Sequence, residues 1–295
     1  MLNAADTIIF DLTAIPMSTR LAILDDHAHQ LETKGYSYWS QEPEDRKGFK
    51  LLGVGQDAKT KKGEKLGVDT AILYLSPASN ATPKGTTLCS SAVIAKCLKA
   101  CLYTAGRGRM SSVEMSRLYK TLLFTQRNST FWDMIATEVH ALALKSFKAG
   151  RTLGVRLNGT SDVIIPDWLL NANPDVQFYD YSKNIAYYSD SNLERRANHH
   201  VTLSYSQANF EYADSVVAAF KEGHNVAVVF RSREDVEKAL KSGYKDVPAD
   251  RIVDGDETDV RFMDPRASVG EMGYIVALYA KGNAKSDTSG FVIDY

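Results

Sequence analysis

Segments typical of β-strands alternate with segments typical of helices along most of this 295-residue chain. Strand-like segments are predicted at residues 68–79, 152–162, 176–184, 199–209 and 225–232. Helix-like segments are predicted between and after them, at 111–128, 129–150, 213–223 and 233–243, with a short helix in PDWLLNAN. Such alternation indicates βαβ units and a mainly parallel sheet, as in doubly wound folds and βα barrels. We expect an α/β fold, a partial or complete parallel βα barrel of the TIM type.

The pattern divides the chain into three parts. Residues 1–66 read as an N-terminal extension, with a helix near residues 18–35 and a polar, lysine-rich loop at 57–67. Residues 67–245 hold the βα barrel core with its cysteine loop. Residues 246–295 contain shorter strand-like runs, which we expect to form an antiparallel β appendage packed on the edge of the core.

Composition narrows the class of protein. Lys and Arg total 35 against 36 for Asp and Glu, so overall charge favours neither nucleic acid nor membrane. The N-terminus lacks the basic and apolar regions of a secretory signal, and no apolar run approaches the length of a membrane span. Three cysteines do not make a disulfide framework. We therefore expect a cytoplasmic protein with reduced thiols.

All three cysteines stand close together, at Cys89, Cys97 and Cys101, in a C-x7-C-x3-C pattern. If the segment is helical, Cys97 and Cys101 share one face, and Cys89 can complete a pocket of three thiolates. Three thiolates with an open fourth position suit a [4Fe–4S] cluster, or Zn²⁺ completed by histidine or water. The alternatives are small buried thiols of an ordinary core, or chance clustering.

Polar side chains follow three of the predicted strands where each strand ends. Arg156, Asn158, Ser161 and Asp162 follow the strand at 152–162, Lys183 follows the next, and Ser204 the one after. The carboxyl ends of parallel strands meet at one edge, where α/β proteins place their sites. The alternative is turn chemistry, since Asn, Asp, Gly and Ser form turns readily.

Several short motifs carry a resemblance. A strand ending in LSP is followed by CLKACLYTAG (97–106), VRLNGTSD (155–162) and VQFYDYSKN (176–184). Together they are similar to the phage "gene product 88" family, and that family in turn resembles radical-SAM-type iron–sulfur barrels. The resemblance spans about residues 70–230. The cysteine spacing differs from the C-x3-C-x2-C that radical-SAM enzymes usually have, and no GGE-like motif is visible.

The resemblance implies Cys89, Cys97 and Cys101 as ligands of a [4Fe–4S] cluster that could bind S-adenosylmethionine. It also implies that Asn158, Asp162 and Lys183 line the pocket. With the strand ends, this gives Lys183 and Asp162 as candidate catalytic residues. Candidate cofactor-binding residues are Asn158, Ser161, Ser204 and Arg156.

Three functions remain open at the level of sequence. The first is a radical-SAM-like phage protein that acts on a nucleotide or nucleic acid in the cytoplasm of an infected bacterium. The second is a non-enzymatic nucleic-acid-binding protein whose thiols hold zinc or no metal, with basic segments and tyrosines supplying contacts. The third is a metal-dependent phosphodiesterase using the acidic turn from Asp254 to Asp259.

Overall fold

The computed structural model describes residues 50–55, 58–80, 82, 86–101, 103, 108, 111–189 and 197–295. Within them, nine strands form one mixed sheet in the order β1-β2-β3-β4-β5-β6-β8-β7, with β9 also paired to β6. The helix predicted near residues 18–35 lies outside the described residues, and so does most of the basic GRGR turn (106–109), one of the segments considered for nucleic-acid contacts.

The elements occupy the following ranges. The strands are β1 (Leu52–Val54), β2 (Val68–Leu73), β3 (Thr152–Arg156), β4 (Gln177–Ser182), β5 (His199–Ser204), β6 (Val226–Phe230), β7 (Ile252–Asp254), β8 (Ile275–Tyr279) and β9 (Val292–Ile293). The α-helices are α2 (Ala58–Glu64), α3 (Ser111–Gln126), α4 (Asn128–Lys148), α5 (Asp167–Asn171), α6 (Ala186–Ser189), α7 (Phe210–Lys221) and α8 (Arg233–Ser242). Three 3-10 helices follow, at η5 (Ala249–Arg251), η6 (Arg261–Met263) and η7 (Gly282–Ser286).

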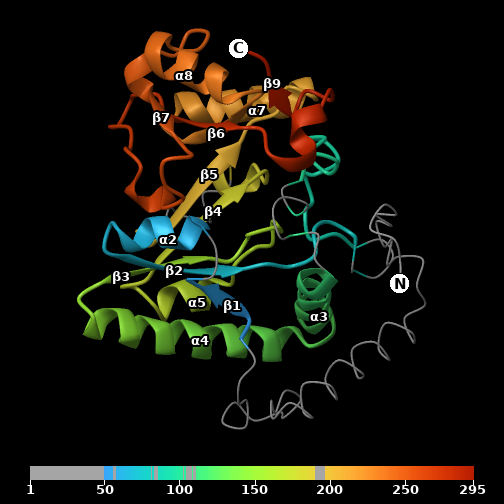
Figure 1. Cartoon of the computed structure of the whole chain (residues 1–295), viewed down its shortest axis with the longest axis vertical. Helices are drawn as coiled ribbons and strands as arrows, with labels where there is room; N and C mark the ends of the chain where they lie inside the picture. Colours follow the sequence, from blue (N-terminus) through green and yellow to red (C-terminus); the bar gives the residue numbers. More distant parts are fainter. Residues whose placement is uncertain are drawn as a thin grey trace.

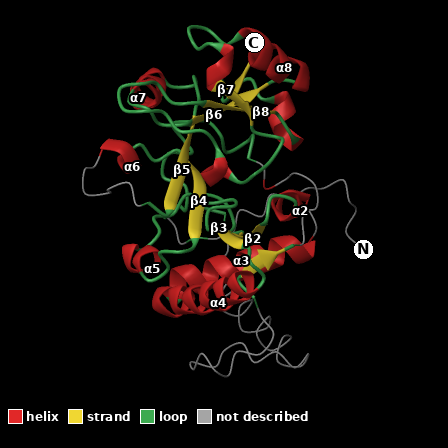
Figure 2. Ribbon diagram, turned by 90° about the vertical axis from the view of Figure 1, so that its left-hand side faces the viewer, coloured by secondary structure: helices red, strands yellow, loops and turns green. Residues whose placement is uncertain are grey.

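Strands β2 to β6 are neighbours in the sheet in the same order as in the sequence, and each pair is parallel. A chain that advances one strand at a time winds in one direction, which places the connecting helices on one face of the sheet. Figure 2 shows this arrangement, with α5, α6 and α7 on one side of the strands and α2 on the other. The parallel α/β core predicted from the alternating pattern is therefore present.

The sheet is open. β1 and β7 are the two ends of the strand order and are not paired with each other. In Figure 1 the strands fan from β2 and β3, beside α4, to β6 near α7 and α8. The closed form of the predicted barrel is not confirmed.

Two apolar clusters lie between the sheet and its helices. The first joins β2, β3 and β4 to α3, α4 and α5, with Phe131, Ile135 and Phe178 fully buried. The second joins β5, β6 and β8 to α7 and α8. Because side chains alternate along a strand, these clusters take every second residue and leave the others on the opposite, inner face. We call the helix-covered side the outer face.

Three predictions about local structure were wrong. The lysine-rich stretch predicted as a loop contains α2, since Ala, Lys and Glu favour helix and Gly63 packs against Thr70 and Val260. The C-terminal strands are parallel, not antiparallel, and β8 lies inside the sheet between β6 and β7. The cysteine segment forms turns rather than a helix, so Cys97 and Cys101 are not paired by helical spacing.

An antiparallel pair joins β1 to β2 at the opposite edge, inside the stretch predicted as extension. Glu138 on α4 accepts hydrogen bonds from the backbone N–H groups of Leu51 (2.8 Å) and Leu52 (3.0 Å). Lys120 on α3 donates to the carbonyl of Leu51 at 2.7 Å. These two charged side chains fix the edge strand to the helices. In the described part of the chain, no helix is long and apolar enough to cross a membrane.

Candidate functional site

Segments that follow three strands, β2, β3 and β4, meet at Asp162, which itself follows β3. Its backbone N–H donates to Leu88 at 2.8 Å, and Asp162 forms an isolated parallel bridge with Cys89. Its carboxylate accepts from the Ser182 hydroxyl (2.6 Å) and from the Lys183 backbone N–H (2.8 Å), both at the end of β4. Asp162 therefore ties the cysteine segment after β2 to the end of β4.

The cysteine segment continues to the end of β5. Ser206, just past that strand, donates its hydroxyl hydrogen bond to the Ala95 carbonyl at 2.8 Å. Cys97 packs against a small apolar cluster that includes Phe291 and Val292. The thiol of Cys89 accepts a long hydrogen bond from the Ala78 N–H at 3.4 Å. These contacts place the cysteine segment beside the residues that follow β3 and β5, and the roles of the three cysteines stay a prediction.

Lys183 is a cation of this region, and it is half-buried. Its ammonium lies 5.3 Å from the centre of the Phe291 ring. Burial by itself lowers the pKa of Lys183, but the nearby Cys97, Asp162, Cys101 and Cys89 outweigh it and raise that pKa above its usual value. All three thiols therefore lie within electrostatic range of one ammonium group.

Two of the thiols, those of Cys89 and Cys101, are held in the neutral form. Burial raises the pKa of Cys89 to about 12, and the charges of Asp162 and Cys101 add to the shift. Burial also raises the pKa of Cys101, against the opposing effects of Lys183 and Arg117. Without a metal or another cation, these two side chains are thiols at neutral pH.

The arrangement of the three thiols can be compared with the ligand geometry that zinc and iron–sulfur clusters require. Among the described residues, no group of three His, Cys, Asp or Glu side chains is arranged to hold a metal ion. A zinc ion needs its ligands gathered around one point, whereas an iron–sulfur cluster holds its cysteines on different irons and so farther apart. The three thiols around Lys183 therefore do not form a ready zinc site, while thiolate side chains are the ligand type that an iron–sulfur cluster takes.

Asn158 and Ser161 are engaged within the turn after β3. The Asn158 side chain donates to the Val163 carbonyl (3.0 Å) and accepts from the Ser161 hydroxyl and the Val163 N–H, both at 2.9 Å. The Asn158 N–H donates to Asp180 at 2.7 Å. These bonds match the turn-forming alternative; cofactor binding by the two residues stays a prediction.

Arg156 and Ser204 lie on the inner face, away from the turn. Ser204 is buried, and its carbonyl accepts from the Tyr212 hydroxyl at 2.6 Å. Arg156 is also buried and forms an ion pair of 3.0 Å with Asp259. Its guanidinium carbon lies 4.9 Å from the centre of the Tyr181 ring. Arg156 therefore belongs to a second polar group, below the thiols.

This second group is named the inner-face cluster. Its members are buried or half-buried polar side chains from β3, β4 and the β7–β8 connection: Arg156, Tyr179, Tyr181, Asp259, Arg261 and Asp264. Gly154 lets the connection come close, since a Cβ there would stand 2.8 Å from the Phe262 ring. The cluster fills the inner face of the strands where the outer face is apolar.

The acidic turn predicted as a possible phosphodiesterase site is occupied by cations of the chain. Asp254 pairs with Arg233 at 2.7 Å, Asp256 pairs with Lys281, and Asp259 pairs with Arg156. Carboxylates already neutralised in this way are poor candidates for a shared divalent cation.

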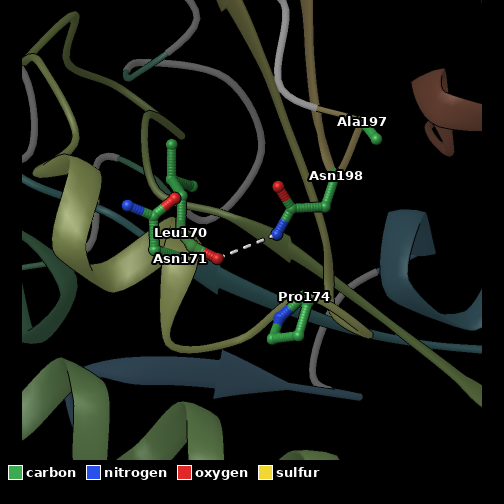
Figure 3. Close-up of a pocket in the computed structure, with 5 residues that line it drawn as sticks. All are labelled: Leu170, Asn171, Pro174, Ala197 and Asn198. Carbon is green, nitrogen blue, oxygen red and sulfur yellow. Dashed lines mark hydrogen bonds between the residues drawn. The ribbon is translucent and has the colours of Figure 1, made fainter.

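A surface hollow lies at the other end of the strands. It measures about 290 Å³ and is lined by Leu170, Asn171, Pro174, Ala197 and Asn198 (Figure 3). Asn198, directly before β5, donates to the Leu170 carbonyl at 3.0 Å. None of the predicted site residues lines this hollow, so it is not the site at the carboxyl ends.

Sequence reasoning missed two residues of the thiol region. Arg117 on α3 donates to the carbonyls of Tyr103 (2.9 Å) and Gly108 (3.3 Å), which follow Cys101. Phe291, near the C-terminus, covers Lys183 and contacts the cluster that contains Cys97. Neither carries a motif, since their role comes from distant parts of the chain folding together.

The fold and the thiol region define an α/β protein with cysteines, a lysine and a carboxylate at the carboxyl ends of parallel strands. A family model described as "Gene product 88" matches residues 50–295. The chain therefore belongs to this phage gene product family, and the resemblance drawn from its motifs is confirmed. No curated protein and no solved structure gives a significant match, and the comparisons lend no support to a radical-SAM relationship.

Proposed function

We propose that the protein is an iron–sulfur protein that acts on a nucleotide or nucleic acid, with Cys89, Cys97 and Cys101 as ligands of a [4Fe–4S] cluster. The observation that carries the proposal is the gathering of three thiols around Lys183 at the ends of β2, β3 and β4. With three cysteine ligands, such a cluster supplies electrons and leaves one iron open to a cofactor such as S-adenosylmethionine.

The chain's own residues have separable tasks in this proposal. Lys183 places a positive charge beside the thiols, which favours their ionised form and attracts an anionic ligand. Asp162 is a positioning residue, because both carboxylate oxygens accept hydrogen bonds from Ser182 and the Lys183 backbone. Phe291 shields the lysine from water on one side.

The metal content of protein purified without air tests the proposal. We expect brown protein with iron and sulfide in equal amounts, and loss of both in Cys89→Ser, Cys97→Ser and Cys101→Ser. Lys99→Gln is the matched control, since Lys99 is exposed within the same segment and should keep the colour. Colourless wild-type protein, with zinc or with no metal, would contradict a cluster.

Binding of S-adenosylmethionine is a separate measurement on the brown protein. Calorimetry should show saturable binding that is weaker in Lys183→Met, which keeps the side-chain volume and removes the charge. An intact cluster without such binding would retain the iron–sulfur site and reject the radical-SAM reaction.

The second candidate is a nucleic-acid-binding protein with metal-free thiols. It is favoured by the raised pKa of Cys89 and Cys101, since neutral thiols are stable in a buried site without metal. Here the metal-free protein should bind single-stranded oligonucleotides, measured by fluorescence anisotropy, with an affinity that falls steeply as salt is added. Failure of the metal-free protein to bind would exclude this candidate.

A further inference from the structure

The inner-face cluster holds hydrogen-bond donors that the chain does not use. Within the described residues, five buried donor groups of the cluster have no hydrogen-bond partner: Arg156 Nε, the hydroxyls of Tyr179 and Tyr181, and Arg261 Nε and Nη1. One buried acceptor of the cluster, Asp264 Oδ2, also has no hydrogen-bond partner. Arg261 Nη1 lies 3.1 Å from that oxygen, so the charges pair although no N–H is aimed at it.

Such a surplus is unusual in a protein interior. Most buried polar groups are hydrogen-bonded, and each unpaired one costs about 1–3 kcal/mol. Arg156 and Arg261 are 5% and 3% exposed, and Tyr179 is fully buried, so bulk water does not reach them freely. The cluster therefore needs acceptors that the chain does not supply.

The unpaired donors share one neighbourhood. Tyr179 and Tyr181 are two apart on β4 and face the same side of the sheet. The Arg156 guanidinium packs over the Tyr181 ring, and Tyr181 also interacts electrostatically with Arg261. The Tyr179 ring stands 5.7 Å from Phe262, the residue after Arg261.

We propose that the inner-face cluster binds a small oxyanion, either a free ion or the phosphate or carboxylate group of a larger molecule. Guanidinium and phenol donors bind oxyanions strongly when water is excluded. Lys183 lies two residues beyond Tyr181 on the same face, so its positive charge stands at the carboxyl end of the sheet on the side of the cluster. The proposal does not depend on a metal at the cysteines.

Calorimetric titration of the full chain with sodium phosphate, sulfate and acetate, against chloride at matched ionic strength, tests this site. We expect saturable binding of at least one oxyanion and none of chloride. Binding of phosphate and sulfate alone identifies a phosphoryl-type group, and binding of acetate alone identifies a carboxylate. No saturable binding of any of the three would overturn the proposal.

Variants locate the binding. Tyr181→Phe and Tyr179→Phe remove only an unpaired hydroxyl, so they should fold at least as well as wild type and bind about three- to tenfold more weakly. Arg261→Gln should abolish oxyanion binding. If the Arg261→Gln variant does not fold, the two tyrosine variants test the proposal in its place. Tyr212→Phe is the control, because its hydroxyl bonds Ser204 outside the cluster. If both tyrosine variants bind the oxyanion with wild-type affinity, the two hydroxyls do not contact it, and binding at the inner-face cluster would be contradicted.

Discussion

The two faces of the sheet differ in what they bury. On the outer face, β3 and β4 contribute Leu153, Val155 and Phe178 to the apolar cluster beneath the helices. On the inner face, the same two strands contribute Arg156, Tyr179 and Tyr181. Buried parallel strands are usually apolar on both faces. The alternation here therefore separates a polar inner face, where we propose binding, from an apolar outer face that packs against the helices.

The inner face is also divided along the strands. The thiols, Lys183 and Asp162 lie at the carboxyl ends, where the chain connections are long. The inner-face cluster lies deeper, under the β7–β8 connection. Charged groups at both levels are at least half-buried and lie beside partners of opposite sign, as burial in a low dielectric requires.

Phe178 and Tyr179 give the strongest test of this comparison, since they are adjacent on β4 and face opposite ways. Phe178→Ala should lower the free energy of unfolding by about 3–5 kcal/mol, because it opens a cavity in a fully packed cluster. Tyr179→Phe should change it by less than about 1 kcal/mol, because the lost hydroxyl has no partner. Urea denaturation followed by circular dichroism measures both. Similar losses in the two variants would mean that the faces do not differ.

The buried pair of Arg156 and Asp259 tests whether the inner face depends on charge balance. Asp259→Leu should cost about 3 kcal/mol, because Arg156 is then buried without its 3.0 Å partner. The double variant Arg156→Met with Asp259→Leu should recover much of that loss, since no unpaired charge remains. The same denaturation experiment gives the coupling energy. Additive losses would show that the two side chains act independently.

Lys120 on α3 allows a test of whether a buried charge on the helix-covered side also affects the stability of the protein. Burial lowers the pKa of Lys120 to about 8, although Glu138 opposes the shift. In the unfolded chain its pKa is 10.5, so the folded protein loses this proton first. Between pH 8 and 10.5 the unfolded state binds more protons, and stability should rise with pH by about 1–3 kcal/mol.

The control for this pH dependence is Lys120→Met, which removes the titrating group. The unfolding free energy of wild type minus that of Lys120→Met should be small or negative below pH 8. It should increase above pH 8, because wild type gains stability there. A difference that stays constant from pH 7.5 to 9.5 would contradict a depressed pKa for Lys120.

Much of the secondary structure could be predicted from local patterns. The strands β2 to β6 and the helices α3 and α8 fall within the segments that the sequence indicated, and α4 and α7 overlap theirs but begin one and three residues earlier. The strand ends also carried their own signal, since polar residues follow apolar runs at Asp162 and Lys183. These features depend on periodicity and turn chemistry within a few residues, which sequence contains directly.

The remaining features depend on contacts between distant parts of the chain. β8 enters the sheet between β6 and β7, and β1 pairs antiparallel with β2, because neighbouring strands offer unpaired backbone groups that no local pattern records. The role of Arg261 could not be predicted from the sequence either, because this residue lies in a connection that folds over β3 and β4.

The sequence by itself determined the parallel α/β core, the family, and the grouping of reactive residues at the strand ends. Only the tertiary structure decided that the sheet stays open, that the cysteine segment forms turns, and that Arg156 pairs with Asp259 across 103 positions of the chain. The physical reason is the distance along the chain over which each effect acts. Periodicity and turn preference act within a few residues, whereas burial and charge pairing are fixed only when distant segments exclude water together.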